Sequence, residues 1–452
     1  MGVYLLLLVG ATTAVTDAAA ACAAWPACGD GFGLPTSASG ALALGHRLAA
    51  VAVGLLVVAV GAVAWRDGRS NRVRAALALA ALLYPAQATL GAVVATSPTD
   101  VGLSTAHLAL GTAIFLPLVA ALAWTLERDT GDPDDAPDPD GVLRDDLPPA
   151  PDADHRPTPP DALPARLVAT ARAYVRLTKP RLMWLLCLVA GAAMALAGGA
   201  ALSPRVVAAT LGGGVLAIGA SGTFNHVLER DVDRRMARTN DRPVAVDLVS
   251  VRNATAFGVV LAVASVALFA TVNLLAAALG VVAILFYSVV YTLLLKPNTV
   301  QNTVIGGAAG ALPALIGWAA VTGSVGYGGL VLAAVVFLWT PAHFYNLALA
   351  YRDDYERGGF PMMPVVRGET TTRKHVLYYL GATLVAAAAL VPVDPLGGLY
   401  AVTAVALGAV FLAAVVRLHY ERTDAAALRA FHASNAFLGA LLFAVVVDAT
   451  LV

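Results

Sequence analysis

Charged residues are scarce in this sequence, and lysine is almost absent. Only 13% of the 452 residues are charged, and just three of the 29 basic residues are lysines. The formal net charge is zero, so the composition gives no indication of a nucleic-acid partner. Three cysteines are too few for a disulfide framework. Hydrophobic residues make up 59% of the chain and the mean hydropathy is +0.76, so we expect the chain to reside in a lipid bilayer.

Long apolar runs separated by short charged segments make up most of the sequence. Each run has about 18 to 24 residues, the length that a helix needs to cross the hydrocarbon core. The runs are continuous and not alternating, which argues against a transmembrane barrel. The sequence therefore predicts an all-α polytopic membrane protein with about thirteen spans. Four spans are expected near residues 3–20, 46–65, 74–95 and 104–126, and nine near 182–200, 206–228, 252–273, 275–295, 302–322, 328–350, 375–393, 397–417 and 430–450.

Aspartate and proline dominate the segment from Glu127 to Ala165. This segment holds twelve of the 29 acidic residues. Like-charge repulsion and proline keep such a segment extended, so we interpret it as a linker, with a docking site as the alternative. The predicted parts are a four-span half-domain at 1–126, an acidic Pro-rich linker at 127–165 and a nine-span bundle at 166–452.

Arginine and lysine are concentrated in every second loop, which predicts the orientation of a multi-pass cell-membrane protein. By the positive-inside rule these loops and the linker face the cytoplasm. The loop with Cys22 and Cys28 then lies outside. The two cysteines are close in the chain, and we expect them to form a disulfide.

The most informative segment runs from Asn225 to Asp233 at the predicted cytoplasmic end of the span near 206–228. On a helix, Asn225, Glu229 and Asp233 recur every four residues and share one face. Three oxygen ligands in a row are typical of a site for a hard cation such as Mg²⁺ that also binds substrate phosphates. Asp231 points off this face and is a direct ligand only if the helix unwinds. The alternative interpretation is a solvated helix end paired with nearby arginines.

A second acidic cluster, which contains Tyr351, Asp353 and Asp354, follows the span near 328–350 on the same predicted side. Two acidic clusters that face one compartment can hold Mg²⁺ and a diphosphate between them and neutralise a leaving group. Nearby basic side chains can bind the remaining phosphate oxygens. These basic residues are Lys179, Arg238, Arg242 and Lys296. Each of them alone is more typical of a positive-inside anchor.

These motifs resemble those of the intramembrane aromatic prenyltransferases, and several longer stretches resemble the haem O synthase branch of that family. The stretches are Leu177-Thr-Lys179-Pro180-Arg181, Glu229 to Pro243, Tyr291 to Lys296, Gln301 to Pro313, Trp339 to Phe344 and Tyr351 to Val366. Together with the rest of the matching sequence they span about residues 170 to 450. The family's usual aspartate is Glu229 here, and His226 stands where the wider family has aspartate.

The resemblance implies transfer of a farnesyl group from farnesyl diphosphate to a vinyl group of haem B. It implies Mg²⁺ ligands at Asn225, Glu229, Asp231, Asp233, Asp353 and Asp354, and substrate contacts from Lys179, Arg181, Arg238, Arg242, Lys296, His343 and Tyr351. The acidic motifs alone leave a quinone precursor or a chlorophyll-type alcohol open as the other substrate. A haem carrier without enzymatic activity, or a transporter, is the alternative from another class. Transporters more often place polar groups at the midplane of the membrane than at one face.

Two histidines before the linker are matched in position. His46 and His107 each open a span that runs inward from the predicted outer face, so they lie at one depth in a four-helix bundle. This arrangement is typical of bis-histidine haem ligation. Together with Cys22 and Cys28 the pair resembles one half of haem A synthase, which implies a bound haem and a separate haem A synthase as partner. Ala43 replaces that family's catalytic glutamate, so we expect haem binding or transfer and not haem oxygenation.

Overall fold

The computed structural model of the chain describes residues 1–15, 22, 25–26, 28, 35–96, 101–132, 135, 162–392 and 396–451. These residues form helices and connecting turns, with no strand among them. Within this part of the chain, eleven helices are long and apolar enough to cross a membrane. The prediction of an all-α polytopic membrane protein is therefore confirmed.

Two of the predicted spans are less clear than these eleven. Helix α1 (Gly2–Val15) has only 14 residues, and residues 16–20 of the expected span lie outside the described residues. Helix α15 (Glu369–Leu390) has the expected length but begins with charged residues that include Arg373 and Lys374. The division into four and nine spans therefore stays a prediction.

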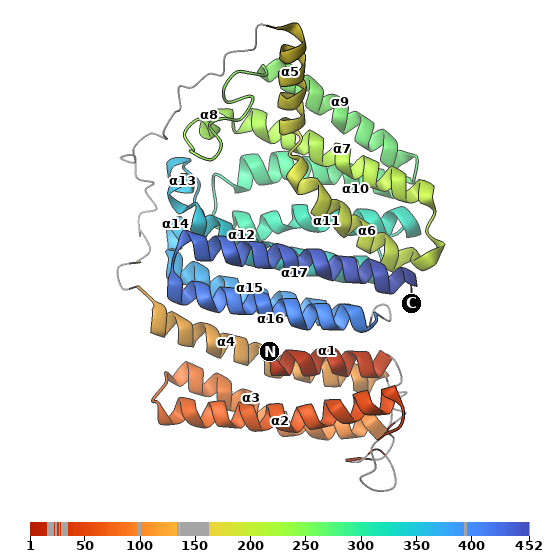
Figure 1. Cartoon of the computed structure of the whole chain (residues 1–452), viewed down its shortest axis with the longest axis vertical. Helices are drawn as coiled ribbons and strands as arrows, with labels where there is room; N and C mark the ends of the chain where they lie inside the picture. Colours follow the sequence, from red (N-terminus) through yellow and green to blue (C-terminus); the bar gives the residue numbers. More distant parts are fainter. Residues whose placement is uncertain are drawn as a thin grey trace. The chain divides into compact units, whose positions relative to one another are not determined.

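The described chain divides into two compact units, and unit 1 combines segments from both halves of the sequence. It comprises Met1–Gly131, Arg373–Arg422 and His432–Val452. Its helices, labelled in Figure 1, are α1, α2 (Ala38–Arg66), α3 (Asn71–Thr96), α4 (Val101–Thr130), α16 (Gly398–Glu421) and most of α15 and α17 (Asp424–Leu451). Gly381 of α15 packs against α4 so closely that a Cβ would lie 2.8 Å from Cγ1 of Val119. The half-domain predicted at 1–126 thus shares its core with C-terminal helices, and its boundary stays a prediction.

Helix α4 continues into the segment predicted to be the linker. It ends at Thr130, and Asp129 in its last turn forms an ion pair of 2.6 Å with Arg69. This pairing stabilises a turn that the acidic composition alone disfavours. Residues 133–134 and 136–161 of the predicted linker lie outside the described residues.

Unit 2 comprises Asp132–Thr372 and Thr423–Phe431. Its helices are α5 (Leu163–Leu177), α6 (Pro180–Gly198), η2 (Gly199–Ala201), α7 (Pro204–Leu228), α8 (Arg230–Asp233), α9 (Val251–Ala270), α10 (Leu274–Leu285), η3 (Phe286–Leu295), α11 (Asn302–Thr322), α12 (Tyr327–Ala350), α13 (Arg352–Arg357) and α14 (Met363–Arg367). The long helices of this unit lie side by side in Figure 1. Small residues allow this close packing. At Gly317 of α11, for example, there is no room for a side chain against the backbone of Ala190 in α6.

Candidate active site

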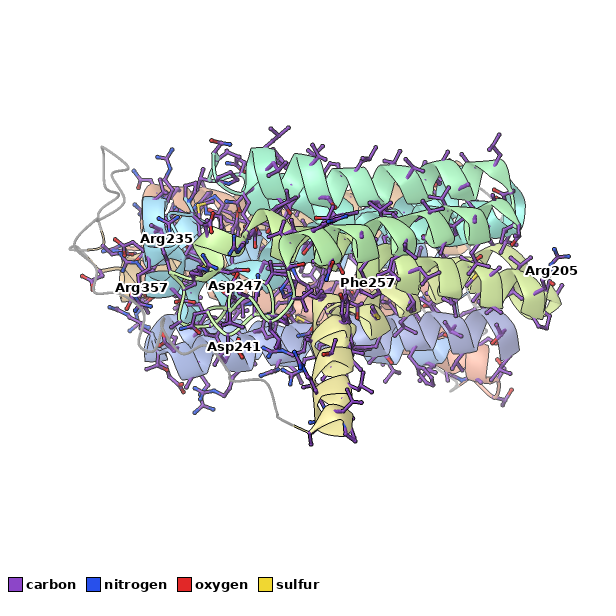
Figure 2. The ribbon with its side chains drawn as sticks, turned by 90° about the horizontal axis from the view of Figure 1, so that it is seen from above. Arg205, Arg235, Asp241, Asp247, Phe257 and Arg357 are labelled. Carbon is purple, nitrogen blue, oxygen red and sulfur yellow. A yellow bond between two sulfur atoms is a disulfide. The ribbon has the colours of Figure 1, made fainter. Side chains whose placement is uncertain are left out.

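Charged side chains of unit 2 gather at one end of its helices. Figure 2 shows Arg235, Asp241, Asp247 and Arg357 at this end, whereas Arg205 lies at the opposite end of α7. We call the first end the polar end. It is built from the C-terminal end of α7, helix α8, the turns that follow α8, and helix α13.

The predicted row of ligands lies at the polar end. Helix α7 ends at Leu228, but the backbone N–H of Glu229 still bonds to Asn225 O at 2.9 Å, and that of Asp233 bonds to Glu229 O at 2.7 Å. Helical spacing therefore continues into α8, and the three side chains remain on one face. We call these three residues, Asn225, Glu229 and Asp233, the acidic row. They are 2%, 6% and 2% exposed, in that order. The side chain of Asp231 is 85% exposed and points away from them.

Basic side chains pair with these buried acidic groups. Lys296 Nζ lies 2.5 Å from Oε1 of Glu229. Arg242 Nη1 donates to both oxygens of Asp233, at 2.7 and 2.8 Å, and lies 3.7 Å from Oε2 of Glu229. Lys179 Nζ donates to the amide oxygen of Asn225. Three cations thus face two carboxylates, so the site has an excess of positive charge for an anionic ligand.

Burial and neighbouring charges act together on the titration of this network. Burial lowers the pKa of Lys179 to about 7, and the positive charge of Arg242 acts in the same direction. Burial raises the pKa of Glu229, but the nearby cations, led by Lys296, leave it below its ordinary value. Burial raises the pKa of Asp233, and Arg242 opposes that rise only in part. The carboxylates therefore depend on their basic partners to remain charged.

The second acidic cluster splits into a buried and an exposed carboxylate. Asp354 is buried, and its two oxygens accept hydrogen bonds from the backbone N–H groups of Ala237 at 2.6 Å and Arg238 at 3.2 Å. Arg357 also donates to Asp354, at 3.1 Å. Asp353 is exposed on α13. The structure therefore attaches Asp354 to the turns after α8 and does not bring Asp353 into the same cluster.

Aromatic side chains hold the segment after α8 in place. Arg238 donates from Nη2 to the hydroxyl of Tyr355 at 3.1 Å, and its guanidinium lies 4.9 Å from the ring centroid of Tyr351. Met236 is buried in one cluster with Tyr355 and Phe360. These contacts join the two predicted motifs into one folded element that holds Arg238 against Tyr351 and Tyr355. Tyr355 was not among the predicted site residues, because its contact with Arg238 joins two segments that are far apart in the sequence.

A π-helical segment borders the site. Helix α10 changes to π-helix η3 at Phe286, and the hydroxyl of Thr292 donates to the carbonyl of Tyr287, five residues earlier, at 2.9 Å. The same hydroxyl accepts from Nδ2 of Asn225 at 3.4 Å. π-Helical turns occur frequently at functional sites. Sequence reasoning missed Thr292, because its position in a continuous apolar run resembles that of an ordinary span residue.

Lys179 occupies an unusual backbone position at the mouth of an apolar cavity. It joins α5 to α6 with φ of 52°, a left-handed conformation that is rare for lysine. The cavity has a volume of about 90 Å³, and Lys179, Tyr287 and Ser221 are among its lining residues. Its lining on α7 extends from Thr210 to Gly222, which is about 18 Å of helix at 1.5 Å per residue.

Phe269 lies at the far end of this cavity. The ring is fully buried, and a Cβ at Gly213 of α7 or Gly280 of α10 would lie 2.8 or 2.6 Å from it. Lys179, by contrast, contacts α7 at Gly222. A charged group therefore marks one end of the cavity and an aromatic ring the other.

The two remaining predicted residues of unit 2 lie apart from the acidic row. Arg181 is exposed near the start of α6. His343 of α12 is buried and stacks between Trp339 and Phe431, with ring centroids 4.2 Å apart on both sides. The structure thus places His343 in an aromatic stack and not with the carboxylates.

The acidic row fits a Mg²⁺ that is shared with a substrate diphosphate. Among the described residues, no group of three His, Cys, Asp or Glu side chains lies close enough to hold a metal by itself. Asn225, Glu229 and Asp233 nevertheless provide three hard oxygen donors in one buried row. Mg²⁺ typically takes one or two carboxylates and fills its shell with phosphate oxygens and water. The donor set is therefore suited to a metal–diphosphate complex.

Unit 1 contains the predicted histidine pair, with His46 on α2 and His107 on α4, and both side chains are partly buried. Gln87 Nε2 donates to the carbonyl of His107 at 3.0 Å and lies 3.3 Å from its Nε2. The Nδ1 atoms of His46 and His107 are buried without a hydrogen-bond partner in the described part of the chain. Cys22 and Cys28 are joined by a disulfide, with Cα atoms 4.4 Å apart.

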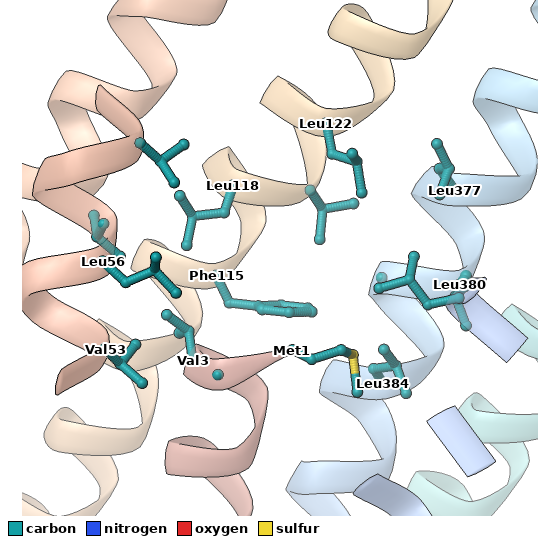
Figure 3. A pocket seen from close by; sticks show the side chains of 16 residues that line it. Met1, Val3, Val53, Leu56, Phe115, Leu118, Leu122, Leu377, Leu380 and Leu384 are labelled. Atoms are coloured by element: carbon teal, nitrogen blue, oxygen red, sulfur yellow. The ribbon is translucent and has the colours of Figure 1, made fainter. Parts of the chain in front are cut away.

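Unit 1 also encloses an apolar cavity of about 180 Å³ (Figure 3). Val53, Phe115 and Leu380 are among its lining side chains, and neither histidine is. The histidine pair and the cavity are therefore separate features of unit 1.

Comparison with known sequences identifies the family. The model of the UbiA prenyltransferase family matches residues 184–441, which include the acidic row, Lys296 and Asp354. The chain belongs to the UbiA prenyltransferase family. A solved structure of a digeranylgeranylglyceryl phosphate synthase shares the fold, with a TM-score of 0.50 and 14% identity over 62% of this chain and 99% of that one.

Two relatives show how far the similarity extends. Protoheme IX farnesyltransferase of Haloquadratum walsbyi is 64% identical over 456 residues, which cover 99% of this chain and 94% of that protein. Protoheme IX farnesyltransferase 1 of Saccharopolyspora erythraea is 45% identical over 303 residues, which cover 66% of this chain and 96% of that protein. Two thirds of this chain thus correspond to almost the whole of the second relative.

Proposed function

We propose that this chain transfers a farnesyl group from farnesyl diphosphate to a vinyl group of protohaem IX and so makes haem O for haem–copper oxidases. The observation that carries the proposal is the buried row of Asn225, Glu229 and Asp233, paired with cations and located beside an apolar cavity. Relatives that match nearly the full chain bear the name protoheme IX farnesyltransferase.

The cations and carboxylates at the polar end would exchange partners when the donor binds. Lys296, Arg242 and Lys179 now pair with the acidic row, and each can transfer its hydrogen bonds to diphosphate oxygens. Glu229, Asp233 and Asn225 would then hold Mg²⁺, which neutralises charge that develops on the leaving diphosphate. Asp353 and Asp354 are the proposed second set of ligands, and Asp354 first has to release the backbone N–H groups that it binds now.

The apolar cavity is the proposed place for the prenyl chain. It begins at Lys179, close to Asn225, and ends at Phe269. Its volume of about 90 Å³ is small for a ligand pocket, so its walls must separate when the chain enters. Apolar walls would also keep water from the reactive carbon until the new carbon–carbon bond has formed.

The reaction balances with water as the third reactant. The allylic C–O bond of the donor breaks and its electron pair leaves with the diphosphate. The terminal vinyl carbon of haem B bonds to the farnesyl carbon, and the oxygen of water bonds to the other vinyl carbon and releases a proton. We propose that His343 in its stack with Trp339 and Phe431 contacts the flat porphyrin, with Arg181 and Tyr351 as further substrate contacts.

The test is to incubate the purified chain with haem B, farnesyl diphosphate and Mg²⁺ and to measure the mass of the haem product. The proposal predicts a haem that has gained one farnesyl group and one hydroxyl group. Release of diphosphate with unchanged haem, together with prenylation of an added quinone precursor or chlorophyll-type alcohol, would assign the chain to the alternative substrate class.

The proposal extends to unit 1. We propose that residues 1–126 correspond to half of a haem A synthase fused to the transferase, and that His46 and His107 bind haem there and can deliver it to a separate haem A synthase. The buried, unpaired Nδ1 atoms support a ligand role for the pair.

We also propose that the polar end faces the cytoplasm, because its loops are rich in arginine. Labelling of an Asp353→Cys variant from one side of sealed vesicles tests the orientation.

A further inference from the structure

Helix α5 has an apolar face and a basic face, yet it touches the rest of unit 2 only near its end. Leu163, Leu167, Val168 and Val175 are between 51% and 68% exposed. The helix contains arginines but no acidic residue. With helical spacing, the four apolar residues gather on one side and the arginines on the other.

The packing of α5 is confined to its last two turns. Ala173 and Leu177 are buried there, and the ring of Tyr174 lies 5.0 Å from that of Phe257 in α9. From Leu163 to Val168 each side chain is exposed. Exposure of leucine and valine side chains to water is unfavourable, so we expect this face to contact an apolar environment.

The direction of α5 relative to the membrane-spanning helices points to the source of this apolar environment. In Figure 1 and in the perpendicular view of Figure 2, α5 runs across the direction of the long helices. Helix α6, a candidate membrane span, begins at Pro180, three residues after α5 ends. Amphipathic helices that lie in the plane of a membrane surface have this orientation relative to the spans.

We propose that α5 lies in the interface of the bilayer that the chain spans. Its apolar face enters the boundary between headgroups and acyl chains, and Arg166 and Arg172 contact anionic lipid headgroups, whereas Arg176 forms an ion pair of 2.7 Å with Asp241. Charge complementarity supports this choice over a protein partner, because a basic helix without acidic residues is attracted to an anionic lipid surface. The anchor would also fix the corner between α5 and α6, where Lys179 has its left-handed backbone.

The test uses the full chain in lipid nanodiscs with a nitroxide label at one cysteine. A Cys187→Ala background removes the free thiol, and Cys22 and Cys28 are paired with each other. Leu167→Cys places the label on the apolar face, and Ala165→Cys, two residues away on the basic face, is the matched control. We expect the label at 167 to collide mainly with oxygen dissolved in the lipid and the label at 165 mainly with a water-soluble nickel complex.

Equal access of the nickel complex to both labels would refute the interfacial position, and so would a label at 167 that neither reagent reaches, because that result indicates a protein partner. A second measurement tests the arginines. Adding phosphatidylglycerol to phosphatidylcholine nanodiscs should lower nickel access at 167 in the chain with its arginines but not in an Arg166→Gln, Arg172→Gln variant. The same response in both would overturn the role of the headgroups.

Discussion

The acidic row of unit 2 and the Nδ1 atoms of the histidine pair of unit 1 are buried polar groups, but they differ in how their hydrogen-bonding capacity is used. Glu229 and Asp233 are paired with Lys296 and Arg242 at 2.5 and 2.7 Å. The Nδ1 atoms of His46 and His107 have no partner among the described residues. Burying a charge is costly unless it is paired, whereas an unpaired neutral imidazole costs far less.

This difference indicates two kinds of ligand. A network of carboxylates and cations can bind a ligand that brings both signs, such as a diphosphate with Mg²⁺, because every group can exchange one partner for another. A pair of neutral imidazoles offers lone pairs to a metal that is already charge-compensated, such as haem iron. Substitutions in the two regions should therefore affect different activities. Their expected effects on prenyl transfer can be ranked by size.

The largest effect is expected at the acidic row. Asp233→Asn removes the charge that faces Arg242 and the proposed metal, so kcat/KM for prenyl transfer should fall by at least about 1000-fold. The matched control is Asp231→Asn, two residues earlier, whose side chain is exposed. Loss of a surface charge should change the rate by no more than about twofold. Similar rates for the two variants in a farnesyl-transfer assay would contradict the role of the buried row.

The second effect distinguishes the two carboxylates of α13. Asp354→Asn leaves one backbone N–H of Ala237 or Arg238 facing an amide N–H, which should slow prenyl transfer on the order of 10- to 100-fold. Hydrogen exchange of residues 236–243 should rise in this variant. Asp353→Asn should leave that exchange unchanged, because Asp353 is exposed. If Asp353→Asn raises the Mg²⁺ concentration needed for half-maximal rate, its proposed role as a metal ligand is supported; an unchanged requirement would argue against it.

The third effect concerns selection among donors. Phe269→Ala removes the ring between Gly213 and Gly280 and lengthens the cavity, so the ratio of geranylgeranyl to farnesyl transfer should rise about tenfold. Phe257→Ala, in the same helix, is the control, because Phe257 packs against Tyr174 and does not line the cavity. A competition assay with both diphosphates gives the ratio independently of the amount of folded protein. An unchanged ratio in Phe269→Ala would show that the length of the cavity does not select among prenyl donors.

The smallest effect on prenyl transfer is expected in unit 1. His46→Ala and His107→Ala should each abolish the six-coordinate haem spectrum of the full chain. With saturating haem B the rate of farnesyl transfer should stay within about twofold, because the histidines belong to unit 1 and the proposed transfer site is built from residues of unit 2. Loss of transfer in both variants with the spectrum retained would reverse the proposed division of roles.

Part of this site was predictable from local spacing. The four-residue repeat from Asn225 to Asp233 predicted a shared face, and the structure brings the three side chains together because helical hydrogen bonds continue past the end of α7. The all-α class followed from the length of the apolar runs. These features depend on neighbouring residues in the chain, which is the information that a sequence pattern contains.

Other features depend on tertiary contacts and were not predictable. Asp354 was expected beside the metal, yet its oxygens bind the backbone of residues 237 and 238, whose conformation is set by packing around Met236. The π-helical turn at Thr292 lies in an uninterrupted apolar run. The position of Phe269 depends on two glycines in other helices, and the sharing of a core between 1–126 and the C-terminal helices also left no local signal.

The measurement that tests the central claim most directly is the affinity of the purified chain for farnesyl diphosphate, titrated with Mg²⁺ present and with a chelator. If the buried row holds a metal–diphosphate complex, Mg²⁺ should tighten binding to the wild-type chain by at least about tenfold, a coupling of roughly 1.4 kcal/mol. The Asp233→Asn variant should show little or none of this gain. Equal affinity of the wild-type chain with Mg²⁺ and with the chelator would contradict the claim.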